Sequence, residues 1–308
     1  MISLRSSILA GFSGCFLFNP TASAEPAKNG QASPVPDASA AEPVKALLIA
    51  GGCCHDYAQQ HKIISKGLQD RANIRVDVIW TPDKSVDPPF DFFKNADWAK
   101  GYDVIIHDEC AAGNKDPEVI ANILNTHKTL PAVQLHCAMH SYRVKEWAQH
   151  IGLLSTRHGP HVPLTVEIVD QEHPITKGMK GWVTGKEELY NNAEVHDAHP
   201  LAMGTQTYNK GGKQVTDSAI VAWVNTKHGA PSFSTSMGHY NEVVQSEEYL
   251  NLITRGTLWA CGKLDKPAYM TAYTGANTIK EIPAKPVKKK PKKVKAPAKA
   301  PAKAQTKG

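Results

Sequence analysis

Four short apolar runs alternate with helix-like segments between residues 45 and 143, and this alternation most constrains the fold. The runs predict strands at residues 45–50, 74–80 and 102–107 and from residue 132 onward. Helical periodicity predicts helices over residues 57–71 and 116–127, the second opened by Asp116-Pro117. Because strands joined through helices pair in parallel with right-handed crossovers, this part of the chain predicts a doubly wound sheet.

The pattern changes after a further helix expected over residues 141–154. Alternating apolar residues predict strands over residues 165–170, 201–208, 218–224 and 232–237, with turns between them and little helix. A closing amphipathic helix is expected over residues 247–261. We therefore expect one α/β domain over residues 44–263, in which C-terminal antiparallel strands extend a mainly parallel sheet.

The N-terminal residues are typical of a secretory signal followed by a linker. Residues 1–24 contain Arg5, an apolar stretch from Ile8 to Phe18 and the cleavage motif Ala22-Ser23-Ala24. Residues 25–43 are small, polar and proline-rich, which predicts disorder. We expect export to the periplasm or the outside of the cell, with no transmembrane segment after signal cleavage.

The basic character of the chain comes from its C-terminal end. From Lys280 onward there are eleven lysines and one acidic residue, a net charge of +10, whereas the whole chain carries +6, which leaves −4 for the rest. A block of like charge is normally a solvated arm, so residues 264–308 are expected to form a disordered Lys/Ala/Pro-rich tail. Such a tail could bind an anionic surface or polymer through counterion release.

Cysteine usage indicates no disulfide framework. The chain has six cysteines, one of them in the expected signal peptide. Cys53 and Cys54 are adjacent, and sequence neighbours rarely have the geometry to bridge each other.

The leading site candidate is the stretch from Ala132 to Arg143, where a buried strand gives way to a helical pattern. His136, Cys137 and His140 lie at this turn, and open α/β sheets place ligands at the carboxyl ends of their strands. The alternative is that Cys137 is a small buried apolar residue and His140 a surface residue of the first helical turn.

Several segments in the same order resemble the ThuA-like family, named for trehalose utilisation, in the class I glutamine-amidotransferase-like superfamily. They are Gly51-Gly52 with His55-Asp56, Val133 to His136, His173 to Met179, Glu188-Leu189-Tyr190, Ser236 to His239 and Leu258-Trp259-Ala260. The resemblance covers roughly residues 45–263. It implies a flavodoxin-like three-layer sandwich and an association with carbohydrate metabolism.

The strand end departs from the pattern of glutamine amidotransferases, which place a cysteine on an elbow flanked by glycines. The positions that flank Cys137 are Leu135 and Met139. Glutaminase chemistry is therefore disfavoured, and the resemblance puts His136 at the elbow. Cys137 remains a second-choice nucleophile, which would need a base such as His140 beside it.

Three histidines, His55, His136 and His239, each follow or end a strand of the same expected sheet. Their loops could converge and hold a divalent metal such as zinc, with an open position for a carbohydrate or keto-sugar substrate. Without a metal, His136, Glu188 and Tyr190 could work as acid and base in hydrolysis, isomerisation or elimination.

Other interpretations of these residues stay open at this point. His107-Asp108-Glu109 is expected to follow the third strand, as a solvated loop or as further carboxylates on the rim of the site. A non-catalytic glycan-binding module would use exposed aromatic residues such as Trp80, Trp98 and Tyr190. A third interpretation is surface adhesion through the basic tail.

Overall fold

The computed structural model describes residues 41–286, so the expected signal peptide, most of the linker and the tail from residue 287 lie outside the described residues. The strands are β1 (Val44–Gly52), β2 (Ile74–Trp80), β3 (Val104–Cys110), β4 (Ala132–Leu135), β5 (Leu153–Leu154), β6 (Val162–Ile168), β7 (Trp182–Glu187), β8 (Glu194–Val195), β9 (His199–Lys210), β10 (Lys213–Asn225), β11 (Ser232–Thr235) and β12 (Ile279–Glu281). The α-helices are α1 (Tyr57–Arg71), α2 (Pro117–Thr126), α3 (Lys145–Ile151), α4 (Asn241–Val244) and α5 (Glu247–Ala260). Short 3-10 helices are η2 (Asp91–Lys94), η3 (His136–His140) and η4 (Pro267–Tyr269).

Ten strands form one mixed sheet in the order β12-β2-β1-β3-β4-β11-β10-β9-β6-β7. Every pairing from β12 to β11 is parallel, and every pairing from β11 to β7 is antiparallel. The expected α/β class, with a parallel sheet extended by antiparallel strands, is confirmed. Because β4 and β11 are parallel neighbours, the turns that carry His136 and His239 leave the same edge of the sheet.

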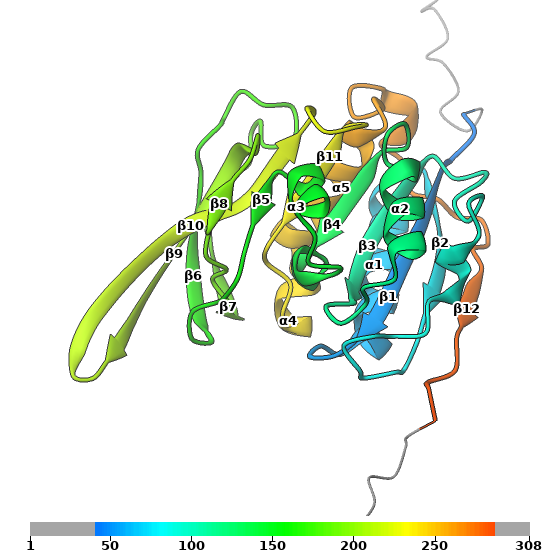
Figure 1. Cartoon of the computed structure of the whole chain (residues 1–308). Coiled ribbons are helices and arrows are strands. Elements are labelled where there is room, and N and C mark those ends of the chain that lie inside the picture. The colour runs from blue at the N-terminus through cyan, green and yellow to red at the C-terminus, as the bar shows by residue number, and fades with distance from the viewer. Residues whose placement is uncertain (1–40, 287–308) are drawn as a thin grey trace, which may run out of the picture. The chain divides into compact units, whose positions relative to one another are not determined.

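Helices cover both faces of the parallel part of the sheet, α1 and α5 on one face and α2 and α3 on the other (Figure 1). Alternate residues of β1 explain the two layers, since Leu48 packs with Ile64 of α1 whereas Leu47 packs in the cluster that holds Ile123 of α2 and Trp147 of α3. The strand is buried on both sides, which is why its sequence is a continuous apolar run.

The helix expected over residues 141–154 is shorter in the structure, where α3 begins at Lys145. Tyr142 and Arg143 have φ values of +57° and +51°, a left-handed conformation that a continuous helix cannot contain. The chain instead leaves η3 through an irregular turn before α3 starts. Within residues 41–286, no helix has both the length and the apolarity that crossing a bilayer requires.

Strand β3 continues to Cys110, so Asp108 and Glu109 belong to the strand and are buried, neither in a solvated loop nor on a rim. Glu109 accepts hydrogen bonds from the ring of His107 at 2.8 Å and from the hydroxyl of Tyr142 at 2.8 Å, which makes it part of a buried polar network. Asp108 and Glu109 are part of a strand although they are polar, because β3 pairs with neighbouring strands in the centre of the sheet.

The ordered chain also extends beyond the boundary expected at residue 263. Strand β12 pairs in parallel with β2 at one end of the sheet, and residues up to 286 are described. The Thr278 N–H donates to Asp77 at 2.7 Å, which ties this segment to β2. Composition alone missed β12 because the strand is exposed and is held mainly through its backbone.

Candidate functional site

His136 lies at the elbow between β4 and η3, with a φ of +44°. This conformation is unfavourable for a side chain with a Cβ atom, and such strain is typical of functional positions. The ring is buried, and Nδ1 lies 2.6 Å from the carbonyl oxygen of Ser236, to which it donates. This hydrogen bond directs Nε2 toward the hydroxyl of Tyr190, at 3.1 Å, and toward Glu188, at 3.5 Å.

His55 and His239 meet His136 and form what we call the three-histidine cluster. The ring centroid of His55 lies 4.6 Å from that of His136 and 4.7 Å from that of His239, and one ligating atom from each ring lies within 4.8 Å of the others. Burial and the neighbouring imidazoles lower the pKa of His55 to about 2, so the ring is neutral. The structure thus brings together the three residues predicted as metal ligands, and their binding of a metal stays a prediction.

Both ring nitrogens of His55 are buried and have no hydrogen-bond partner among the described residues. A buried polar atom without a partner normally costs about 1–3 kcal/mol, so native proteins rarely keep one without a function. A neutral imidazole nitrogen is also the form that coordinates a metal ion. This unsatisfied ring makes the three-histidine cluster a group that could hold a metal ion.

Glu188 lies between the three-histidine cluster and a second pair, His158 and His161, which we call the outer histidine pair. Its Oε2 lies 3.2 Å from His239 Nδ1, and its Oε1 lies 2.9 Å from His161 Nε2 and 3.3 Å from His158 Nδ1. Burial alone would raise the pKa of Glu188, but contacts with His136 and His239 hold it well below its usual range. Glu188 is therefore an ionised carboxylate at the centre of the site.

The contact between Glu188 and His136 shifts the pKa of His136 upward, the opposite of its effect on Glu188. Burial lowers the pKa of His136, but the hydrogen bond to Glu188 and the charges of Glu187 and Glu188 raise it above its usual value overall. Contact with the two carboxylates therefore favours the protonated form of His136 more than burial disfavours it.

Glu187 holds the backbone around this site. Its carboxylate is fully buried and accepts hydrogen bonds from the N–H groups of Gly238 at 2.8 Å, His239 at 3.1 Å and Glu188 at 2.8 Å. One side chain on β7 thus positions two of the residues that line the site. The position of Glu187 in the chain, next to Glu188, did not by itself indicate this role.

Cys137 and Tyr190 are both buried beside His136. The Cys137 thiol lies 3.1 Å from Cys110 Sγ and 3.8 Å from the hydroxyl of Tyr190, and its surroundings raise its pKa well above the usual range. His140 points elsewhere, with Nε2 3.1 Å from the hydroxyl of Ser155. A buried thiol that keeps its proton is a poor nucleophile, and His140, the base expected beside it, contacts Ser155 instead, so the geometry gives Cys137 no support as one.

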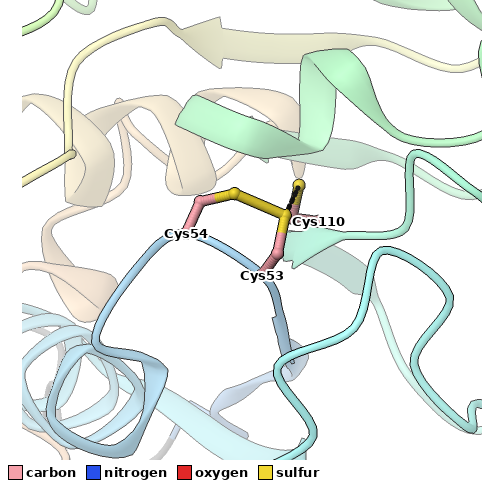
Figure 2. A group of neighbouring side chains, drawn as sticks. All are labelled: Cys53, Cys54 and Cys110. Atoms are coloured by element: carbon pink, nitrogen blue, oxygen red, sulfur yellow. Dashed lines mark hydrogen bonds between the residues drawn. A yellow bond between two sulfur atoms is a disulfide. The ribbon is translucent and has the colours of Figure 1, made fainter. Parts of the chain in front are cut away.

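A disulfide joins Cys53 and Cys54, the loop residues directly before His55 (Figure 2). The expectation that these neighbours do not bridge is wrong, because Cys54 has a φ of +85°, a backbone conformation that sequence spacing does not reveal. Cys53 Sγ also lies 3.4 Å from Cys110 Sγ. The bridge restrains the loop that presents His55 to the three-histidine cluster.

A pocket of about 690 Å³ adjoins the site on the side of His158 and Tyr190. Its lining is mostly polar and includes Arg157, Asn191 and Asp217. Side chains of this kind can hydrogen-bond the hydroxyl groups of a small polar ligand.

The aromatic residues suggested for glycan stacking do not offer free faces. Tyr190 and Trp98 are buried, and Trp80 is half-buried and stacked on His61 at a centroid distance of 4.6 Å. The outer histidine pair, which lies closer to the surface, was missed by sequence reasoning. Its only signal was the spacing of His158-Gly-Pro-His161, two histidines three residues apart in a turn.

One solved structure shows the same fold, and two others give lower scores. A crystal structure of a ThuA-like protein from Parabacteroides merdae superposes with a TM-score of 0.59 at 20% identity, covering 73% of this chain and 92% of that chain. A glutamine amidotransferase from Thermotoga maritima gives a TM-score of 0.35 at 10% identity, covering 63% of this chain and 75% of that one. A β-galactosidase from Bacillus circulans gives 0.44 at 11% identity, covering 72% of this chain and 31% of that one.

No curated protein matches the chain significantly. The family model described as ThuA, trehalose utilisation, matches residues 45–260, which include His55, His136, Glu188 and His239. This match spans most of the chain, and the fold agrees with it. The chain therefore belongs to the ThuA family.

Proposed function

We propose that this protein is an enzyme that acts on a carbohydrate or a keto derivative of one, with a divalent metal ion bound by the three-histidine cluster. The observation that carries the proposal is the partly buried ring of His55, whose two buried nitrogens lack partners among the described residues although two further imidazoles face it. Three neutral imidazoles are a common ligand set of catalytic zinc. A bound ion would polarise a carbonyl or hydroxyl group of the substrate.

The surrounding residues supply the remaining functions of such a site. The Ser236 carbonyl, by accepting from His136 Nδ1, leaves Nε2 free to bind the ion once its proton is lost. Glu188 is an ionised carboxylate in a mostly buried site, and it can accept a proton from a substrate hydroxyl or carbon. Tyr190 keeps its proton, because burial raises its pKa, and it can donate a hydrogen bond to a substrate oxygen.

The substrate class is supported by the family and by the pocket beside the site. The family description refers to trehalose utilisation. The volume of about 690 Å³ and the polar lining suit a sugar-sized ligand with several hydroxyl groups. Hydrolysis, isomerisation and elimination all begin with the same two elements, a polarised oxygen and a base.

The test is metal content by elemental analysis of the full chain, purified without chelator or affinity tag. We compare the parent with a His136→Ala/His239→Ala double variant and with a His199→Ala control, whose ring is exposed and pairs with Asp170. Near-stoichiometric zinc, manganese or iron in the parent and the control, lost in the double variant, is the expected result. Parent protein that stays metal-free after supplementation would contradict the metal proposal, leaving metal-free acid–base chemistry on Glu188 and His136.

We further propose that the protein is exported and that the Lys-rich tail adheres to an anionic surface. The Cys53–Cys54 disulfide supports export, since disulfides persist mainly in oxidising compartments. The intact mass of protein recovered from the producing cells tests this, because cleavage after Ala24 leaves Glu25 as the first residue. Removal of residues 287–308 should abolish surface retention and leave the thermal stability unchanged.

A further inference from the structure

Glu188 faces two separate sets of imidazoles with its two carboxylate oxygens. Oε2 lies 3.2 Å from His239 Nδ1 and 3.5 Å from His136 Nε2, whereas Oε1 lies 2.9 Å from His161 Nε2 and 3.3 Å from His158 Nδ1. A carboxylate placed in this way has the arrangement of a ligand that bridges two metal ions.

We propose that the site binds two divalent metal ions that share Glu188. The first ion occupies the three-histidine cluster, and the second is held by the outer histidine pair. This inference rests on the proposed function and extends it from one ion to two, with Glu188 as a shared metal ligand in place of the base role that it has in the one-ion site. In two-metal sites the ions lie about 3.5–4 Å apart, a separation that a bridging carboxylate readily spans.

The outer histidine pair has the geometry of a ligand set. One ligating atom each from His158, His161 and Glu188 lies within 4.8 Å of the other two. The Nδ1 atom of His161 lies 2.7 Å from the hydroxyl of Tyr240, a contact that orients the ring with Nε2 toward Glu188. His158 Nδ1 also faces the carbonyl oxygen of Gly159 at 2.8 Å, so a bond to the ion replaces that contact.

The two ligand sets differ in exposure, and this difference assigns their roles. The side chains of His136 and His239 are 2% and 13% exposed, whereas those of His158 and His161 are 42% and 39% exposed. The inner ion would therefore be less exposed than the outer ion, which would keep more open positions. Catalytic metal ions retain such open positions for water or substrate.

The position of the outer histidine pair also restricts the class of substrate that the site could bind. His158 lines the polar pocket of about 690 Å³, so a ligand in that pocket reaches the outer ion directly. Two ions can hold two neighbouring oxygens of one substrate and stabilise charge on both. The chemistry this favours is that of a sugar with adjacent hydroxyl or keto oxygens.

The test measures metal stoichiometry rather than activity. The full chain, depleted of metal, is titrated with Zn²⁺ alone by calorimetry, and bound zinc is counted by elemental analysis after dialysis. We expect two zinc ions per chain for the parent and one for a His158→Ala/His161→Ala double variant. A His199→Ala/His228→Ala double variant, which removes two carboxylate-paired surface histidines, should still bind two.

Manganese provides a second measurement, and its result for the parent does not depend on how well any variant folds. In the parent loaded with Mn²⁺, two ions that share a carboxylate should give an exchange-coupled electron paramagnetic resonance spectrum, replaced in the outer-pair variant by that of isolated Mn²⁺. One zinc ion per parent chain, with an uncoupled manganese spectrum, overturns the two-ion proposal and leaves the one-ion function standing. No bound metal in the parent overturns both.

Discussion

Glu187→Gln tests how the site is held together, because this one carboxylate accepts hydrogen bonds from three backbone N–H groups. The variant keeps the size of the side chain but replaces one acceptor oxygen with an NH₂ group, which must then face an N–H donor. One charge-assisted hydrogen bond, about 1.5–3 kcal/mol, is lost, and a buried donor is left unsatisfied at about 1–3 kcal/mol. Removing a buried charge offsets part of this, since burial already disfavours the ionised form and raises the pKa of Glu187.

The net expectation is a loss of roughly 2 kcal/mol in the free energy of unfolding. For a domain of this size that lowers the melting temperature by about 4–8 °C. Metal affinity should fall as well, by about 10- to 100-fold, because Gly238, His239 and Glu188 lose their shared anchor. Thermal melts followed by circular dichroism and competition with a chromophoric zinc chelator measure the two effects.

The matched control is Glu167→Gln, on an exposed position of β6. It should leave both the melting temperature and the zinc affinity at parent values. If Glu187→Gln also melts within about 1 °C of the parent and binds zinc equally well, the hydrogen bonds to Glu187 do not position the site and the reasoning fails.

Two further predictions concern parts of the molecule beside the site. Burial lowers the pKa of His150 from 6.5 to about 4, so its neutral form stabilises the fold fully above pH 6.5, and this contribution is lost as the pH falls toward 4. At pH 5 the loss in the free energy of unfolding is about 2 kcal/mol. In denaturant titrations, the free energy of unfolding of His150→Gln should therefore fall less from pH 7 to pH 5 than that of the parent. An equal fall in the two proteins would refute this. A Cys53→Ser/Cys54→Ser variant frees the loop before His55 and should bind zinc about tenfold more weakly, whereas Cys261→Ser should not; equal affinity would show that the bridge does not position His55.

The parallel half of the fold followed directly from local patterns in the chain. The helix expected over residues 57–71 and the strand expected over residues 74–80 have those bounds in the structure. Their apolar periodicities are long and are ended by turn residues, which makes their ends visible in the sequence. The polar end of β3 and strand β12 were missed, since sheet pairing rather than local pattern decides whether such segments become strands.

The site was predictable in part. His55, His136 and His239 could be proposed together because the ends of neighbouring parallel strands meet at one edge of a sheet. The outer histidine pair could not, since His158 and His161 lie in a connection before β6 whose path no local pattern describes. The adjacent disulfide was equally hidden, because it depends on the backbone conformation of Cys54.

By itself, the sequence determined the fold class and the order of the elements, because apolar periodicity is a local property that survives in any context. Only the tertiary structure decided how Glu188 lies, with one oxygen toward each set of histidines, and that Glu187 anchors both neighbouring loops. Those contacts join residues far apart in the chain. Their distances depend on packing that no single segment encodes.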